Sequence, residues 1–187
     1  MGWDDTAGGR WNHTHMNEIL RCAGGSLVLP AIVLNDRGDG GHLVVNPPRE
    51  VWERSELTRE ELADWAFLVS AAGQAMLEVL PQLRDGCVNY WEAGNWALND
   101  AALPAGPKSP REHRRVHLHL LGRSRDARHA DWRWGESPRF PDYTDSRTWA
   151  KAFSPLDANE TQAVALRAKS ILAGRYRLHS TCAGIDA

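Results

Sequence analysis

The segment from Thr58 to Leu80 restricts the fold more than any other part of this 187-residue chain. Thr58 and Glu61 have the spacing of a capping box, in which two side chains satisfy free amides at a helix start. Apolar residues then recur at steps of three and four until Pro81, and this period predicts one long amphipathic helix. Because such a helix buries its apolar face, we expect a sheet to pack against it.

Apolar stretches on both sides of this helix have the features of strands. Residues 26–34 are rich in branched side chains but contain Pro30, which favours two short strands or an edge strand broken at the proline. Residues 42–46 form another strand, and the Gly-rich turn 35–41 between the two stretches is typical of a hairpin. Residues 86–91 predict a further strand after the helix.

The remaining parts of the chain are less regular. Residues 1–25 have no clear period, so we expect an irregular lead-in. Residues 94–113 contain three prolines and form a long loop, which in a compact domain is usually functional or mobile. Asp157 and Glu160 have the spacing of a second capping box, and the amphipathic stretch that follows has Gly174 as its expected C-terminal cap.

Composition excludes several classes of protein. With 42% hydrophobic residues, 25% charged residues and a net charge of −2, the chain is globular rather than disordered or fibrous. It lacks both an apolar run of ~18 to 20 residues and the features of a secretion signal, so we expect a cytoplasmic protein with no membrane partner. Three widely spaced cysteines predict neither a disulfide framework nor a thiolate zinc site, and we expect them to be small core residues.

Tryptophan is unusually abundant, with nine residues against three phenylalanines. Trp91 and Trp96 flank one loop, and Trp132, Trp134 and Trp149 lie in a segment rich in Pro, Arg and Asp. We interpret these rings chiefly as side chains that pin a loop-rich C-terminal extension to the body of the protein. The alternative is that one of them stacks on a base or another planar ligand.

Two histidines give the first indication of chemistry. Residues 116–121 alternate as a strand does, so His117 and His119 lie side by side on one face. Imidazole can act as a nucleophile, an acid, a base or a metal ligand. Three interpretations follow: a solvated pair on an edge strand, a metal site completed by His113 and His42, or a nucleophile with its partner. No other cluster of His, Asp and Glu has metal-ligand spacing, so we expect no metal.

The charge around this pair favours the third interpretation. From Lys108 to Arg133 there are eight basic residues against three acidic ones, within a chain that is slightly acidic overall. Cationic side chains bind phosphate oxygens and stabilise the negative charge that develops when a histidine attacks phosphorus. A solvated arginine-rich loop is the simpler alternative. The sequence carries no signature of a nucleic-acid-binding module, so we expect no nucleic acid partner.

The order of these parts resembles the histidine triad (HIT) superfamily of nucleotide hydrolases and transferases. Residues 116–122 are similar to the family's His-φ-His-φ-His-φ-φ motif, with His117 at the middle, nucleophilic position and His119 at the third. Residues 41–47 resemble the segment in which a Gly-His pair opens a strand that ends at proline. Asn89 lies where the family has an asparagine that helps to hold the nucleotide. The resemblance covers about half of the chain.

The chain also departs from the family pattern. Arg115 occupies the position of the first triad histidine. The segment that leads to the triad is longer than usual and ends with residues 108–113. The acidic residue expected to hold the ribose hydroxyls falls near Asn35 and Asp36, and residues 125–187 have no counterpart in small family members.

The resemblance implies an α+β, HIT-like fold with an antiparallel sheet, a long packed helix and a Trp-rich C-terminal extension. Residues 1–124 would form the nucleotide-binding and catalytic domain, residues 125–187 would pack on it, and the protein would be a homodimer without a cofactor. The implied activity is hydrolysis at the α-phosphate of a phosphoramidate, a dinucleoside polyphosphate or a nucleotide conjugate. The alternatives are a nucleotidyltransferase or phosphorylase that uses the same intermediate, and a nucleotide-binding protein without turnover.

The resemblance also implies roles for single residues. His117 would attack the α-phosphorus and form a nucleotidyl-histidine. His119 and His42 would bind phosphate oxygens or the leaving group and keep the nucleophile in its reactive tautomer. The residues expected to bind the substrate are Arg115, Asn89, Asp36, Asn35, Lys108, Ser109, Arg111 and His113.

Overall fold

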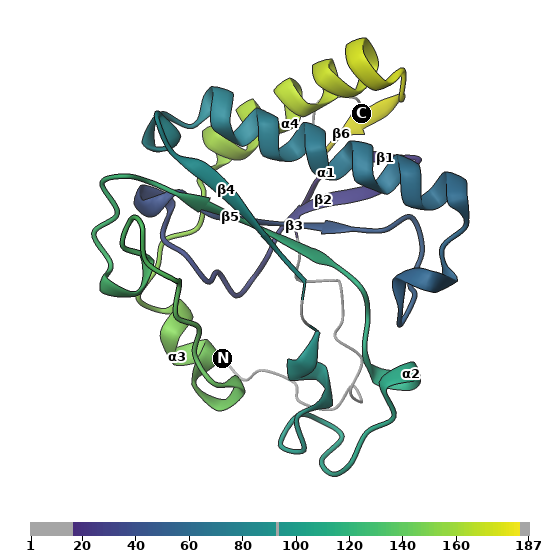
Figure 1. Cartoon of the computed structure of the whole chain (residues 1–187), viewed down its shortest axis with the longest axis vertical. Helices are drawn as coiled ribbons and strands as arrows, with labels where there is room; N and C mark the ends of the chain where they lie inside the picture. The colour runs from purple at the N-terminus through teal and green to yellow at the C-terminus, as the bar shows by residue number, and fades with distance from the viewer. Residues whose placement is uncertain (1–16, 93, 184–187) are drawn as a thin grey trace, which may run out of the picture.

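The computed structural model describes residues 17–92 and 94–183, and its centre is a six-stranded antiparallel sheet. Helices α1 (Arg59–Val79) and α4 (Ala158–Ile171) cover one face, while the short helices α2 (Pro110–His113) and α3 (Ser146–Ala150) lie with the loops on the other side (Figure 1). The predicted antiparallel sheet and long helix are thus confirmed. The strand order is β4-β5-β3-β2-β1-β6, and the strands are β1 (Asn17–Cys22), β2 (Gly25–Leu29), β3 (His42–Asn46), β4 (Cys87–Trp91), β5 (Leu118–Arg123) and β6 (Ser180–Cys182).

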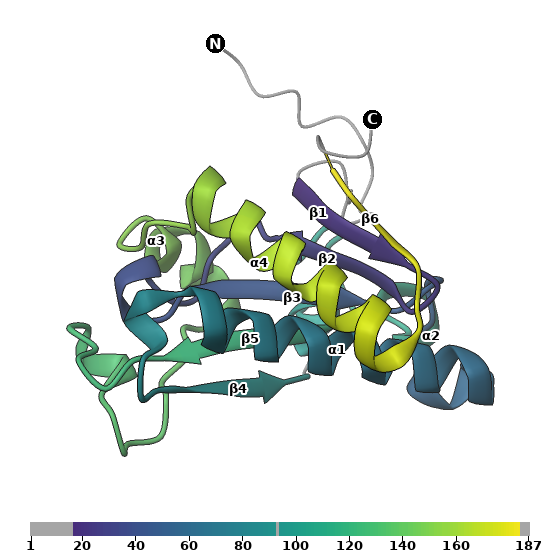
Figure 2. The same ribbon diagram turned by 90° about the horizontal axis from the view of Figure 1, so that it is seen from above.

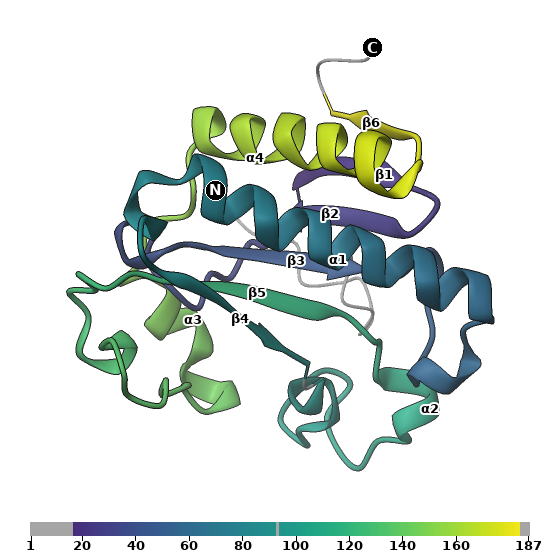
Figure 3. The same ribbon diagram turned by 45° about the horizontal axis from the view of Figure 1, so that its top comes forward.

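Helix α1 closes one face of the sheet. The side chain of Thr58 accepts from the amide of Glu61, whose carboxylate accepts from the amide of Thr58, so the predicted capping box is present. Trp65, Leu68 and Met76 are buried on its inner side, in one core with apolar residues of the strands. Helix α4 lies beside α1 on the same face (Figures 2 and 3). Neither these two helices nor any other helix of the described chain has the length and apolarity needed to span a membrane.

The N-terminal part contains one more strand than the sequence predicts. Strand β1 begins at Asn17, inside the expected irregular lead-in, and pairs antiparallel with β2 and β6. A bulge between Glu18 and Leu20 shifts its register, and this bulge hides the alternation that would otherwise indicate a strand. Residues 1–16 of the expected lead-in lie outside the described residues.

The predicted hairpin is confirmed, but the role expected for Pro30 is not. Strand β2 pairs antiparallel with β3, with Val28 opposite Val44. It ends at Leu29 and has a neighbour on each side, so it is a single interior strand rather than an edge strand or two short strands. Pro30 lies just beyond the ladder, where its missing N–H removes no sheet hydrogen bond.

The C-terminal part of the chain adds to both the helical layer and the sheet. The predicted capping box at the start of α4 is present, and β6 pairs with β1. The helix does not end at Gly174 as expected. It continues as a π-helical turn, Leu172–Tyr176, and stops where Arg177 adopts a left-handed conformation with φ 57°. Because the helix ends in this wider π turn, the left-handed position falls on Arg177 and not on Gly174.

The segment between β5 and α4 covers the other face of the sheet and forms a second core. Trp132 and Phe153 are buried together with Leu121 of β5 and Leu34. By contrast, Trp134 is 39% exposed. Four further rings pack around this second core, namely Trp91, Trp96, Phe140 and Trp149. The sheet therefore lies between two apolar clusters, one on each face.

The cysteines differ in burial. Cys182 is buried and Cys22 is half-buried, but Cys87 is exposed on β4. The expectation of three core cysteines is therefore wrong for Cys87. The reason is that β4 forms an edge of the sheet, where the part of the chain that the structure describes gives it a neighbouring strand on one side only.

Candidate active site

The face of the sheet that lies away from α1 carries two of the three histidines expected to be catalytic. His42 begins β3 opposite Leu121 of β5, and His119 of β5 lies opposite Val44. Because side chains alternate along a strand, Leu120 points into the core beneath α1 while His42 and His119 point the other way. Adjacent strands therefore present these two imidazoles on one surface.

A close backbone contact brings β3 and β5 together at this point. Gly40, just before β3, touches Gly122 of β5, and a Cβ on Gly122 would lie 2.1 Å from the Gly40 carbonyl oxygen. Only glycine permits this approach, because any side chain at Gly122 would collide with backbone. The amide of Gly122 also donates to the Gly41 carbonyl at 3.0 Å. The start of β3, and with it His42, is thereby fixed against β5.

His117 lies just before β5 rather than within it. The strand starts at Leu118, two residues later than predicted, because the amide of Val116 bonds to the carbonyl of Val51 instead of joining the ladder. The two imidazoles meet nevertheless. The ring centroids of His117 and His119 are 4.7 Å apart, with the planes at 70°.

One chain of hydrogen bonds joins the three imidazoles, and we call it the histidine chain. The amide of Leu34 donates to Nδ1 of His42 at 3.1 Å. Nε2 of His42 lies 2.9 Å from Nδ1 of His119, and Nε2 of His119 lies 3.1 Å from Nε2 of His117. Nδ1 of His117 lies 2.9 Å from the carbonyl oxygen of Arg115.

The two ends of the histidine chain determine where each proton lies. A backbone amide can only donate, so Nδ1 of His42 accepts and its proton is on Nε2. A neutral imidazole has one donor and one acceptor, so His42 donates to Nδ1 of His119 and His119 donates from Nε2 to Nε2 of His117. His117 then carries its proton on Nδ1 and donates it to the Arg115 carbonyl. Nε2 of His117 keeps its lone pair, which is the form a nucleophile needs.

The surroundings keep two of the rings neutral. His42 is 1% exposed, and burial, together with the charge that His117 can carry, lowers the pKa of His42 to about 3. Burial, with His42 and His117 nearby, also holds the pKa of His119 well below its usual value. Both rings are therefore uncharged near neutral pH, as the pattern of one donor and one acceptor requires.

Aromatic rings border the histidine chain on the side of β4. The ring centroid of Trp91 lies 5.3 Å from that of His119 and 4.2 Å from that of Phe140, with the Trp91 and Phe140 planes at 10°. Phe140 in turn meets the buried ring of Trp132 edge-on. Trp91 therefore links the histidine chain to the second core, and these contacts favour a packing role over stacking on a ligand.

Among the residues expected to bind substrate, Asn89 is the one that reaches the histidine face from β4. It lies opposite Leu121, and paired residues of neighbouring strands point to the same side. Arg115 bonds instead to Glu50 and to the Arg114 carbonyl. Arg115 thus contributes its backbone carbonyl to the histidine chain, while its side chain pairs with the carboxylate of Glu50.

The remaining residues expected to bind substrate in this region have partners outside the histidine chain. Lys108 donates to two loop carbonyls. Ser109 precedes α2, and Nδ1 of His113 lies 3.2 Å from its carbonyl oxygen. The guanidinium of Arg111 lies over the ring of Trp52 at 5.5 Å. These contacts hold α2 and its loop together.

Asn35 and Asp36, expected near the ribose, are built into the turn before β3. Asn35 is fully buried and donates from Nδ2 to the carbonyl of Gly122 at 2.7 Å. One carboxylate oxygen of Asp36 accepts from the amide of Gly38 and the other from the amide of Ser154, both at 2.7 Å. Both side chains therefore stabilise the backbone that leads to His42.

Two contributors to the site were not predicted. The Leu34 amide and the Arg115 carbonyl set the proton positions, and main-chain groups leave no mark in a sequence pattern.

Arg123, counted among the basic residues that favour an anion, is buried and donates to the carbonyls of Arg133 and Glu136. Part of the positive charge therefore holds the C-terminal segment rather than facing a ligand.

The geometry does not favour the metal interpretation. Both ring nitrogens of His42 and of His119 are engaged within the histidine chain. His113, the other proposed ligand, bonds within α2. Across residues 17–92 and 94–183, no group of three or more His, Cys, Asp or Glu side chains is arranged to hold a metal ion.

One hollow of the described chain lies apart from the histidine chain. It has a volume of about 820 Å³, and none of the three chain histidines lines it. Its walls include Asp39 and His129. The carboxylate of Asp39 accepts from the amides of Arg128 and His129 at 2.7 and 2.9 Å, so both of its oxygens stabilise the backbone of the fold. We therefore place the candidate site at the histidine chain.

Comparison with known proteins gives a likeness in structure only. No protein-family model matches the chain, and no curated protein matches it. Among solved structures, the chain is similar to a hypothetical histidine triad nucleotide-binding protein from Sulfolobus tokodaii strain 7, with 13% identity and a TM-score of 0.43 over 86% of this chain and 87% of that one. A likeness of this size assigns neither a family nor an activity to this chain.

Proposed function

We propose that the protein is a nucleotide hydrolase that cleaves at the α-phosphate of its substrate through a nucleotidyl-histidine on His117. The histidine chain carries this proposal, because its proton pattern leaves the lone pair on Nε2 of His117. The resemblance of residues 116–122 and 41–47 to the HIT motifs supports the chemistry. On this basis, residues 1–124 form a HIT-like catalytic domain and residues 125–187 an extension packed on it.

The proposed reaction has two steps. Nε2 of His117 attacks the α-phosphorus, a P–N bond forms, and the bond to the leaving group breaks with its electron pair on the leaving group. The N–H of His119 turns from His117 to a phosphate oxygen, while Nδ1–H of the new imidazolium stays on the Arg115 carbonyl. Water then attacks the same phosphorus, the P–N bond breaks, and the water's proton passes to solvent.

The proton pattern favours leaving groups that depart as anions. His42 uses its single proton to donate to His119, and its other nitrogen faces the Leu34 amide. His119 therefore has no ready source from which to replace a proton that it gives away. Phosphate and polyphosphate need no proton to leave, whereas an amine does. We expect dinucleoside polyphosphates and nucleotide sugars to react faster than phosphoramidates.

Two other functions have specific support. A nucleotidyltransferase or phosphorylase would share the first step and replace water by another acceptor, which the same lone pair of His117 permits. A nucleotide-binding protein without turnover is favoured by the contact of Arg115 with Glu50, because this position then gives the reaction no side chain. Products formed only when phosphate or a sugar phosphate is added would indicate the first, and tight binding without products the second.

The proposed assembly is a homodimer. Among the strands of the described residues, β4 has a neighbour on one side only, and such an edge can pair with another chain. Light scattering after size-exclusion chromatography tests this, and a mass of one chain would contradict it.

The test of the proposed function is release of nucleotide from a mixed panel. Wild type, His117→Asn and His179→Asn are each incubated with nucleoside phosphoramidates, dinucleoside polyphosphates and nucleotide sugars, and products are separated by chromatography. His179→Asn is the matched control, because His179 is exposed and lies next to β6, at the opposite edge of the sheet from β4.

Mononucleotide from wild type and from His179→Asn, but not from His117→Asn, would support the proposal and identify the leaving group. Equal release by His117→Asn would overturn the nucleotidyl-histidine. No release from any substrate by folded wild type, with or without phosphate, would favour the binding protein.

A further inference from the structure

We infer that the C-terminal segment positions the nucleophile of the proposed reaction by holding the Leu34 amide against His42, with Asp36 as the principal tie. Asp36 would then be a positioning residue that acts through Leu34 and His42. The effect on catalysis rests on the proposed function, whereas the effect on the tautomers of the histidines does not.

The Leu34 amide is not held by the sheet. Strand β2 ends at Leu29, and the next regular element, the short 3-10 helix Arg37–Asp39, begins after Leu34. Within residues 17–92 and 94–183, no strand ladder includes the peptide that donates to His42. Its position therefore depends on contacts made by residues around it.

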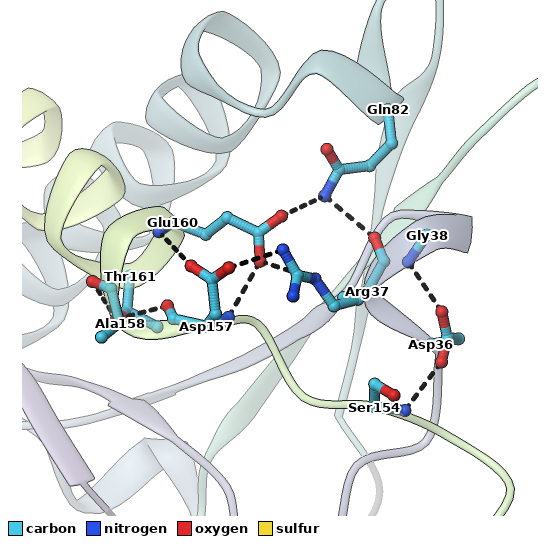
Figure 4. Close-up of polar contacts among 9 residues, drawn as sticks. All are labelled: Asp36, Arg37, Gly38, Gln82, Ser154, Asp157, Ala158, Glu160 and Thr161. Atoms are coloured by element: carbon cyan, nitrogen blue, oxygen red, sulfur yellow. Dashed lines mark hydrogen bonds and ion pairs between the residues drawn. The ribbon is translucent and has the colours of Figure 1, made fainter.

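Those contacts come largely from the C-terminal segment. The carboxylate of Asp36 joins the amide of Gly38 to the amide of Ser154, both at 2.7 Å (Figure 4). The amide of Arg37 donates back to the Ser154 carbonyl at 2.9 Å. A longer bond of 3.5 Å runs from Nε1 of Trp149 to the carbonyl of Leu34 itself. Three hydrogen bonds thus tie Leu34, Asp36 and Arg37 to residues 149–154.

Packing fixes the same stretch from a second direction. The side chain of Leu34 is 2% exposed and lies in the second core with Phe153 and Trp132. Asn35 bonds to the carbonyl of Gly122 on β5. The Leu34 peptide is therefore held between β5 and the C-terminal segment, and the segment supplies most of its partners.

Ion pairs nearby join Arg37 to the start of α4 and do not involve Leu34. The guanidinium of Arg37 pairs with Asp157 and Glu160 at the start of α4, and Gln82 bridges Glu160 and the Arg37 carbonyl (Figure 4). Asp157, like Asp36, caps a helix through a backbone amide. It differs from Asp36 in having no bond to residues 149–154. This difference makes Asp157 a matched control.

The direction of the histidine chain explains why the Leu34 amide matters. Without that donor, His42 could carry its proton on Nδ1 and accept at Nε2. His119 would then donate from Nδ1 to His42, leave its Nε2 as an acceptor, and draw the proton of His117 onto Nε2. In this reversed chain, Nε2 of His117 has no lone pair for attack, and Nδ1 of His117 has no proton to donate to the Arg115 carbonyl. The Leu34 amide and the Arg115 carbonyl therefore favour the same, reactive proton pattern from opposite ends of the chain, and the Leu34 amide is the end that the C-terminal segment holds.

The experiment is to determine the tautomers by ¹⁵N NMR of the imidazoles in the full-length protein without substrate. Wild type should show the proton on Nε2 of His42 and His119 and on Nδ1 of His117. Asp36→Ala, which loses both acceptors, should show a mixture of tautomers at His42 and His119. Asp36→Asn should restore part of the wild-type pattern, and Asp157→Ala should keep all of it despite the loss of a cap.

A double variant, Asp36→Ala with Trp149→Phe, should shift the mixture further. If Asp36→Ala does not fold, Trp149→Phe alone carries the test, with a smaller shift in the same direction. Wild-type tautomers in both Asp36→Ala and the double variant would overturn the inference, as would an equal change in Asp157→Ala. Tautomers that respond as expected in a protein that releases no nucleotide would leave the inference standing and contradict the proposed function instead.

Discussion

The two faces of the sheet are packed by different means. Under α1 and α4, apolar side chains such as Leu68 and Leu120 meet other apolar side chains, and short-range periodicity places them. On the opposite face, aromatic rings such as Trp132 surround a polar interior in which His42 and His119 are held neutral by burial. One face thus relies on apolar packing alone, whereas the other also depends on protonation state and on a directed hydrogen-bond chain.

This difference shows how a sheet can serve as a scaffold on one side and position a reactive group on the other. Strand β5 contributes to both, because its successive residues alternate between the faces. The helix face holds the strand rigidly, so the histidine face can contain uncharged imidazoles without losing its geometry. The cost of burying those imidazoles should appear in the pH dependence of stability.

The largest expected effect that separates the faces is therefore loss of stability in acid. The pKa of His42 is about 3 in the folded protein, against about 6.5 when unfolded, so the unfolded state binds more protons between these values and stability falls as pH falls. The slope approaches about 1.4 kcal/mol per pH unit, for a total of roughly 5 kcal/mol at pH 3. His119 should add to the loss in the same direction.

Urea unfolding at a series of pH values measures this effect, with His42→Gln as the control that removes one titrating group. Below pH 6.5, the free energy of unfolding of wild type should fall more steeply with decreasing pH than that of His42→Gln. Parallel curves for the two proteins would show that His42 is not held neutral.

A pair of neighbouring leucines sharpens the comparison further. Leu120 and Leu121 are both 0% exposed, but Leu120 lies in the core under α1 and Leu121 in the second core. Leu120→Ala and Leu121→Ala should each cost about 2 to 5 kcal/mol of unfolding free energy through the cavity they leave. Only Leu121→Ala should also change the imidazole ¹⁵N pattern. A change of equal size in Leu120→Ala would contradict the separation of the faces.

Substitutions of His42 should have an intermediate effect, seen in catalysis of the proposed reaction. A glutamine at this position can place an amide N–H where Nε2 lies and donate to His119, whereas the shorter asparagine cannot reach it. His42→Asn should lower kcat roughly 10- to 100-fold below wild type, with His42→Gln between the two, because small displacements of a nucleophile have effects of this order. Equal kcat for all three proteins would show that the chain ends at His119.

The smallest effect belongs to the helix face. Thr58→Ala removes the side-chain acceptor of the α1 capping box and should cost about 1 kcal/mol. It should leave the imidazole tautomers and their pH dependence unchanged, which NMR and unfolding curves can check together. A shift of the His42 pKa in this variant would contradict the prediction, because it would show that the two faces are coupled.

Sequence patterns anticipated the helix face better than the histidine face. The period of α1 and its Thr58 and Glu61 cap are local features, so they can be read from neighbouring residues. The bulge in β1 and the π turn that replaces a cap at Gly174 are irregularities for which periodicity gives no signal. The helix face could therefore be predicted except where the backbone departs from ideal geometry.

The candidate site could be predicted only in part. His42, His117 and His119 were identified from residue type and motif, and the structure brings them into one hydrogen-bond chain. The Leu34 amide could not be found in this way, because a backbone donor has no residue signature. The pairing of Arg115 with Glu50 depends on contacts between segments far apart in sequence, which charge counting does not resolve.

The central claim is that the lone pair on Nε2 of His117 is the nucleophile. The most direct measurement is to quench a single turnover of wild type with a dinucleoside polyphosphate and map the protein by mass spectrometry under conditions that preserve P–N bonds. A nucleoside monophosphoryl group on the peptide that contains His117, formed before free nucleotide and absent from His117→Asn, is the predicted result. Nucleotide released without this adduct, or at the same rate by His117→Asn, would contradict the account.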